Sequence, residues 1–198
     1  MFMTLAAAVV ALVLGHVAPE FAAAVRRHGW FDDWLRWLGA RFPQGNWQGR
    51  WGIALALFPP LLLVALLQWA LDTPLYGSIG LLFGIAILFY CWGPRDLDLD
   101  VDAIVDAPDV AARNAAIARL TPNGGDIASL LTAVFHAARR RWFGVLFWFL
   151  LLGAFGAVLY RLVALAAEDD AALLPSGNAA GAKHLLAWLE WPVSQLMA

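Results

Sequence analysis

Residues 51–71 read WGIALALFPPLLLVALLQWAL and carry no charged side chain between Arg50 and Asp72. A helix rises about 1.5 Å per residue, so a helix of this length reaches roughly 30 Å, which is the thickness of the hydrocarbon core of a bilayer. The stretch therefore predicts a transmembrane helix. Pro59 and Pro60 lie inside it, and we expect neighbouring helices to satisfy the carbonyl groups that the two prolines leave free.

Three further apolar segments accompany this stretch. Residues 73–94 are a second uncharged run, and it follows so closely that the two runs predict a transmembrane helical hairpin over residues 51–93. Residues 142–166 predict another transmembrane helix, in which Arg161 is expected to reach toward the lipid headgroups. Residues 1–18 are apolar but short, and either cross the bilayer or lie at its surface.

The composition agrees with an all-α, polytopic integral membrane protein of three or four transmembrane helices. Of the 198 residues, 62% are hydrophobic and 14% are charged, whereas soluble domains carry about 25% charged residues. The net charge of -2 provides no basic surface of the kind that binds nucleic acid. Cys91 is the single cysteine, so no intramolecular disulfide can form. The partner that this composition predicts is the lipid bilayer.

Arginine is concentrated in two of the segments between the apolar runs. Five arginines lie in residues 16–50 and six in residues 94–141, whereas the turn of the hairpin has none. Positive charge favours the cytoplasmic side of a membrane. Residues 19–50 and 94–141 are therefore predicted to face the cytoplasm from a bacterial inner membrane, and the tail, residues 167–198, is predicted to be extracytoplasmic.

Both cytoplasmic segments contain amphipathic helical patterns. Trp30, Trp34, Trp37 and Leu38 fall on one face of a helix. That helix either lies in the membrane surface or packs on another part of the protein. In residues 127–138, apolar side chains recur with i, i+3, i+4 spacing and predict a second amphipathic helix.

No motif predicts a catalytic residue, a metal site or a cofactor. Asp98, Asp100 and Asp102 are similar to the start of a calcium loop, but Ala103 stands where that loop needs glycine, and a solvated acidic face is the simpler interpretation. The four histidines lack metal-ligand spacing, and no glycine-rich nucleotide motif is present. The clear spans contain no carboxylate or lysine, which argues against an ion-coupled transporter.

Three consecutive arginines, Arg139, Arg140 and Arg141, precede the third apolar segment. Guanidinium groups bind phosphate well, so these residues are candidates for contact with a lipid headgroup or a phosphate ligand. The alternative is that they anchor the end of the following helix on the cytoplasmic side.

The segment after these arginines resembles the AmpE family, within the AmpE/CobD-CbiB superfamily. The residues that carry the resemblance are Phe147, Trp148, Gly153, Gly156, Tyr160 and Arg161. The order of an apolar N-terminus, an aromatic and arginine-rich segment, a tight hairpin and a cytoplasmic stretch is similar as well. The resemblance implies a membrane signalling protein that takes part in β-lactamase induction, with a cytoplasmic muropeptide amidase of cell-wall recycling as a pathway partner.

The CobD/CbiB branch implies an alternative function, a membrane enzyme that attaches an aminopropanol arm to cobyric acid. That branch carries a Glu-Asn pair and an Asp-Gly pair just before the shared helix, where this chain has His136, Ala137, Arg140 and Arg141. Without the carboxylates, the ligase chemistry is not expected. Members of the AmpE branch also continue beyond the point at which this chain stops, so the chain is expected to be either a truncated form, with a truncated tail, or a short homologue.

Overall fold

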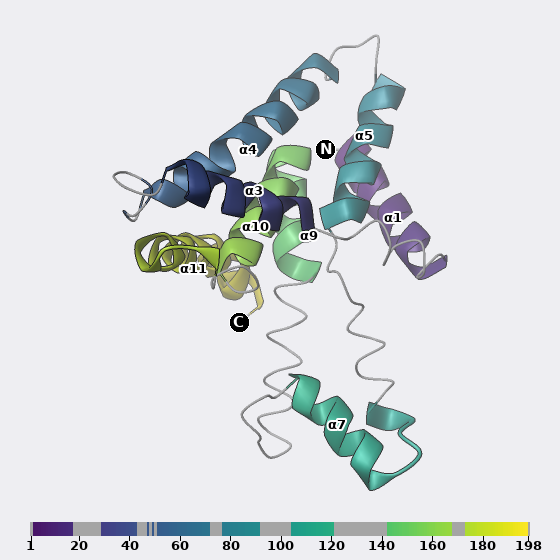
Figure 1. Ribbon diagram of the computed structural model, residues 1–198. Coiled ribbons are helices and arrows are strands. Elements are labelled where there is room, and N and C mark those ends of the chain that lie inside the picture. The colour runs from purple at the N-terminus through teal and green to yellow at the C-terminus, as the bar shows by residue number, and fades with distance from the viewer. Residues whose placement is uncertain are drawn as a thin grey trace.

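The fold consists of α-helices joined by short and long connections (Figure 1). The computed structural model describes residues 2–17, 29–42, 47, 49, 51–71, 77–91, 104–120, 142–167 and 173–197. Within these ranges the chain forms no strand, so the all-α prediction is confirmed. The helices in chain order are α1 (Phe2–Val17), α3 (Gly29–Arg41), α4 (Gly52–Leu71), α5 (Gly77–Cys91), α7 (Val110–Leu120), α9 (Gly144–Leu152), α10 (Ala154–Ala167) and α11 (Ser176–Met197).

Among the described helices, only α4 is long and apolar enough to cross a bilayer. It has 20 residues and continues through both internal prolines. The missing N–H of Pro60 leaves the carbonyl of Ala56 without its usual helical donor. Trp34 Nε1 of α3 donates a hydrogen bond to that carbonyl oxygen at 3.0 Å. The expectation that a neighbouring helix satisfies a freed carbonyl is therefore confirmed at Ala56.

Helix α3 packs on α4 near this proline pair. Phe31, Leu35 and Leu38 of α3 are buried. This is not the predicted face: of the Trp30, Trp34, Trp37 and Leu38 set, Leu38 is buried, whereas Trp30 and Trp37 are exposed. Trp37 remains half exposed, and its ring stacks on that of Trp34 with the centroids 5.2 Å apart.

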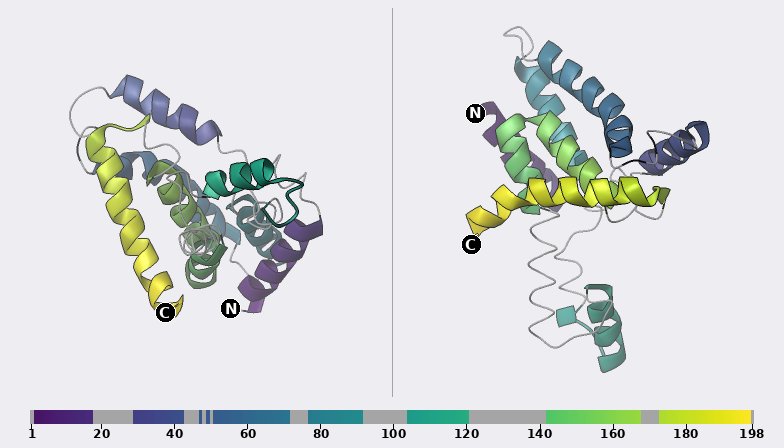
Figure 2. Two further views of the ribbon diagram at one scale, coloured as in Figure 1. Left: turned by 90° about the horizontal axis from the view of Figure 1, so that it is seen from below. Right: turned by 90° about the vertical axis from the view of Figure 1, so that its left-hand side faces the viewer.

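The apolar segment over residues 142–166 is not one helix, and the prediction of a continuous span there is wrong. Helix α9 has 9 residues and helix α10 has 14. Between them Gly153 adopts a φ of 69° and a ψ of -149°, a conformation that is open to glycine and strained for other residues. The chain reverses at this glycine, and the two helices lie side by side (Figure 2).

Two close approaches prove that α9 and α10 form an antiparallel hairpin. A Cβ atom on Gly144 would lie 2.2 Å from the ring of Tyr160, and a Cβ atom on Gly156 would lie 2.1 Å from the carbonyl oxygen of Trp148. In a straight helix the members of these two pairs would be about 24 Å and about 12 Å apart. Only glycine lets the two backbones approach so closely.

Helix α10 is the centre of the molecule. All of its residues except Phe155 and Leu159 are buried, because α4, α5, α9 and α11 surround it. A helix that is apolar on every side is suited to such a position. Helix α1 joins this group through α5, and a Cβ atom on Gly84 of α5 would rest in ordinary contact with Ala7 of α1, at 3.7 Å.

The described part of the tail, residues 173–197, packs against the start of α4. Asn178 of α11 is fully buried against Gly52, at the start of α4, and the backbone of Trp47 meets the same glycine. Residue 47 belongs to the segment predicted to face the cytoplasm, so the start of α11 lies beside that segment, at the start of α4. The turn at Gly153 accounts for this contact, since α10 begins beside Gln68, near the end of α4, and the chain that follows it reaches Gly52, at the start of α4.

Helix α7 is the described part of the segment over residues 94–141, and it lies apart from the other helices (Figures 1 and 2). Its first turn is capped by Asp109, whose Oδ1 accepts a hydrogen bond from the Ala112 N–H at 2.6 Å. The helix predicted over residues 127–138 lies outside the described residues. So do the aspartates of the calcium-like frame at positions 98, 100 and 102.

Candidate functional site

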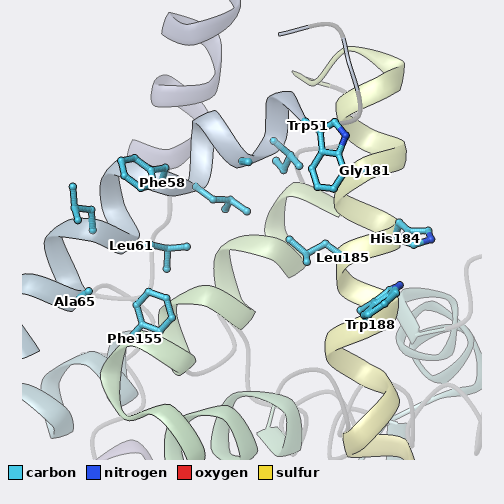
Figure 3. Close-up of a pocket in the computed structure, with 13 residues that line it drawn as sticks. Trp51, Phe58, Leu61, Ala65, Phe155, Gly181, His184, Leu185 and Trp188 are labelled. Atoms are coloured by element: carbon cyan, nitrogen blue, oxygen red, sulfur yellow. The ribbon is translucent and has the colours of Figure 1, made fainter. Parts of the chain in front are cut away.

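An open groove of about 770 Å³ lies between α4 and α11, with α10 at its floor (Figure 3). Pockets of this size are typical of sites for small molecules and lipids. The residues that line it are Trp51, Ile53, Ala54, Leu57, Phe58, Leu61, Leu62, Ala65, Phe155, Gly181, His184, Leu185 and Trp188.

The lining follows from helical spacing on two helices. On α11 the positions at i, i+3, i+4 and i+7 from Gly181 face the groove, and a corresponding stripe of α4 faces them. Phe155, which is among the two α10 residues that are not buried, fills the floor between the stripes. His184 is the one titratable side chain in the lining. The groove can therefore hold an apolar ligand, and it lacks a pair of groups for acid–base catalysis.

The polar side chains of the groove, Trp51, His184 and Trp188, lie along its α11 side, with Trp51 beside Gly181 and Trp188 two turns further along the helix (Figure 3). Trp51 and Trp188 are 86% and 69% exposed, and Figure 3 shows His184 next to Trp188 on the outer side of α11. The rings of His184 and Trp188 are 6.2 Å apart between centroids. Within the described chain, the two indole N–H groups and the imidazole of this rim donate no hydrogen bond to protein. They are available to a ligand.

A second polar feature lies at the turn of the hairpin, where Gln68 of α4 meets the ends of both short helices. Its Nε2 donates to the carbonyl of Leu152 at 3.1 Å, and its Oε1 accepts from the N–H of Phe155 at 2.9 Å. One amide thus replaces both a donor and an acceptor that the break at Gly153 removes from the helix. The role of Gln68 is structural, and it fixes the floor of the groove to α4.

The residues that carry the family resemblance fall together on the hairpin. Gly153 forms the turn, Gly156 lies under the Trp148 carbonyl, and Tyr160 lies against Gly144. Trp148 Nε1 also donates to the Leu189 carbonyl of α11 at 3.1 Å, and its ring meets that of Phe147 edge to face, 5.3 Å between centroids. These residues shape and anchor the hairpin.

Arg161, the last residue of that pattern, does not reach out of the molecule as expected. It is 6% exposed, because it stands on the buried helix α10. Its guanidinium acts electrostatically on Tyr90 and Cys91, the last two residues of α5, where the partial negative charge of a helix C-terminus favours a cation. The hydroxyl of Tyr90 in turn accepts a hydrogen bond from Trp30 Nε1. This cluster joins α3, α5 and α10.

In the part of the chain that the structure describes, few observations favour a metal site or a nucleophilic cysteine. No three His, Cys, Asp or Glu side chains there come together as ligands. Cys91 is buried at the end of α5, a position suited to a small packing residue. The candidate phosphate-binding residues Arg139, Arg140 and Arg141 lie outside the described residues.

Sequence reasoning missed both the groove rim and Gln68. His184 has no metal-ligand spacing to the other histidines. Most of the residues that complete the groove lie on a different helix, α4. Gln68 is uncharged, so it did not interrupt the apolar run over residues 51–71. An amide inside such a run nevertheless indicates that a backbone group nearby needs a hydrogen-bond partner. Comparison with models of protein families, with curated proteins and with solved structures finds no match to this chain.

Proposed function

We propose that this chain is a multi-pass protein of the bacterial inner membrane that acts as a regulatory protein of the AmpE kind and not as an enzyme. The observation that carries the membrane part is the outward apolar surface of α4. Of its most apolar window, 22% is buried, whereas the core helix of a soluble protein would be mostly buried. The exposed large side chains of this helix include Leu55, Phe58, Leu62, Leu63, Leu66 and Leu67.

The neighbouring helices extend the same surface. Helix α1 exposes Leu5, Val9 and Val13, and α5 exposes Ile79 and Leu82. Soluble monomers rarely expose apolar patches beyond a few hundred Å². A lipid environment removes this difficulty, since lipid tails are as apolar as the side chains. Helices α1, α4 and α5 are the proposed crossings.

The hairpin of α9 and α10 is proposed to enter the bilayer and return. The chain reverses at Gly153 between helices of 9 and 14 residues, so both outer ends of the hairpin lie on the side of the bilayer from which it enters. Non-helical backbone is tolerated at membrane depth where protein groups satisfy it, and Gln68 does so here. The arginine-rich segments and the tail then share the cytoplasmic side.

The regulatory part of the proposal is supported by the residue pattern of the AmpE resemblance, which coincides with a structural unit, the hairpin. The groove has no acid–base pair, and the described residues hold no metal-ligand cluster. The proposed role is in β-lactamase induction during muropeptide recycling. The amidase of that pathway would meet the cytoplasmic side, which carries α3, α7 and α11.

Deletion of the gene tests this role. We expect a strain without the protein to show altered β-lactamase induction by a β-lactam and altered pools of cytoplasmic muropeptides, and a plasmid copy to restore both. Unchanged induction together with unchanged muropeptides would contradict the regulatory role. Rescue of a cobalamin-arm mutant by the plasmid would instead favour the CobD/CbiB type of enzyme.

A further inference from the structure

We propose that the groove between α4 and α11 binds one membrane lipid, with an acyl chain along its apolar lining and a phosphate headgroup at the rim formed by Trp51, His184 and Trp188. The inference rests on the proposed location in a membrane, and it is independent of the regulatory role.

The groove is continuous with the surface that would face lipid. Phe58 and Leu62 line the open groove, and the neighbouring α4 residues Leu55, Leu63 and Leu66 are exposed outside the lining. An occupant can therefore enter sideways from the bilayer. The lining offers no backbone edge and no charged side chain to fix a peptide, so a hydrocarbon chain is the occupant that its chemistry fits.

The apolar lining cannot select a lipid without help from the polar rim. An acyl chain that moves from the bilayer into the groove exchanges one apolar environment for another, so the hydrophobic free energy changes little. Affinity and selectivity must come from the headgroup. The rim offers two indole N–H donors and one imidazole, and no carboxylate lines the groove to repel an anion. Hydrogen bonds to a charged acceptor such as phosphate are roughly twice as strong as neutral ones.

The rim also lies at the depth where a headgroup would be. Trp51 immediately precedes α4, so it stands at one end of the proposed crossing. Trp188 belongs to α11, whose Gly181 lies near Trp51 (Figure 3). Tryptophan is favoured at this level of a bilayer because its ring is apolar and its N–H is polar.

Native mass spectrometry of the full-length, detergent-solubilised protein tests the inference. The probes are dioleoyl phosphatidic acid, dioleoylglycerol with the same tails and no phosphate, and glycerol phosphate with no tails. We expect one tightly bound phosphatidic acid per chain, with dioleoylglycerol binding weaker by about tenfold for each headgroup hydrogen bond lost. Glycerol phosphate should not bind, because it has no chain for the groove.

Two variants separate the rim from the lining. The double change His184→Leu with Trp188→Phe should weaken phosphatidic acid about tenfold or more and leave dioleoylglycerol unchanged. Ala65→Phe fills the groove and should weaken both lipids, whereas Ala70→Phe, at an exposed position of α4 outside the lining, should weaken neither.

Several results would overturn the inference: equal binding of the two dioleoyl lipids, a ladder of equivalent adducts in place of one bound lipid, or full binding by the Ala65→Phe variant. Carbonate extraction of cell membranes is the parallel measurement for location. Protein that stays in the membrane but binds no phosphatidic acid refutes the lipid site alone, whereas protein that is released into solution refutes the membrane proposal.

Discussion

The indole nitrogen of Trp34 donates to the carbonyl oxygen of Ala56 at 3.0 Å, and this is the carbonyl that Pro60 leaves without a helical donor. A proline pair in the middle of a long apolar helix thus becomes an attachment point for α3. The ring of Trp34 is held there by stacking on Trp37.

The Trp34 bond predicts an interaction that depends on Pro60. Trp34→Phe should lower the free energy of unfolding by about 1–3 kcal/mol, because a buried carbonyl loses its donor. In a Pro60→Ala background the restored N–H of residue 60 satisfies Ala56, so the same change should cost clearly less. Unfolding in SDS by circular dichroism, taken through the full double-mutant cycle, measures both values. Equal costs in the two backgrounds would contradict the assignment.

Gln68 should behave as a two-sided connection. Gln68→Met keeps the volume but loses the bonds to Leu152 and Phe155, and we expect destabilisation of about 1–3 kcal/mol for each unsatisfied backbone group. In its protonated form Gln68→Glu keeps an acceptor for the Phe155 N–H and an O–H donor for the Leu152 carbonyl, so it should be more stable than Gln68→Met in the same assay at a pH low enough to protonate the carboxyl. Identical stabilities of all three proteins would show that the turn does not need the amide.

Gly153 should tolerate no side chain. Gly153→Ala forces a residue with a Cβ atom into a φ of 69°, 2.8 Å from Gln68 Nε2, and a strained backbone of this kind costs about 1–3 kcal/mol. The matched control is Gly84→Ala, because a Cβ atom there meets its neighbours at ordinary contact distances of 3.5 Å or more. Thermal unfolding of both variants in detergent is the measurement. A loss of stability confined to Gly84→Ala would refute the hairpin turn.

The returning hairpin predicts the side of each loop. In a Cys91→Ser background, Asp109→Cys in α7 and Lys183→Cys in α11 should both be labelled by a membrane-impermeant maleimide only after the cells are opened. Ser78→Cys, at the start of α5, should be labelled in intact cells. If Lys183→Cys reacts in intact cells and Asp109→Cys does not, the segment over residues 142–167 crosses the bilayer once, and the hairpin is refuted.

The sequence predicts helices well where charges mark their ends. The uncharged run over residues 51–71 became α4, Gly52–Leu71, and the run over residues 73–94 contains α5, Gly77–Cys91. The prediction of a continuous helix failed at Gly153, because hydropathy does not register backbone conformation and glycine is common in apolar helices. The error at Arg161 follows from the same break, since a residue near the far end of a single span becomes a central residue once the chain turns back.

The candidate site was harder to predict for a different reason. The groove forms where α11 crosses α4, and the lining stripes on the two helices are far apart in the chain. No local pattern pairs Trp51 with His184 or Trp188. The stripe on α11, at i, i+3, i+4 and i+7 from Gly181, was identified only from the structure.

Gln68 and Leu152 are 84 residues apart in the sequence, and this separation sets an order for biogenesis. If the chain is inserted in a membrane as proposed, the ribosome completes α4 before it makes the hairpin, and the turn at Gly153 depends on an amide that α4 supplies. The hairpin therefore has to partition into the membrane beside a helix that is already resident there. An α4 that reaches the lipid late, or not at all, would leave the newly made turn exposed to quality-control proteases.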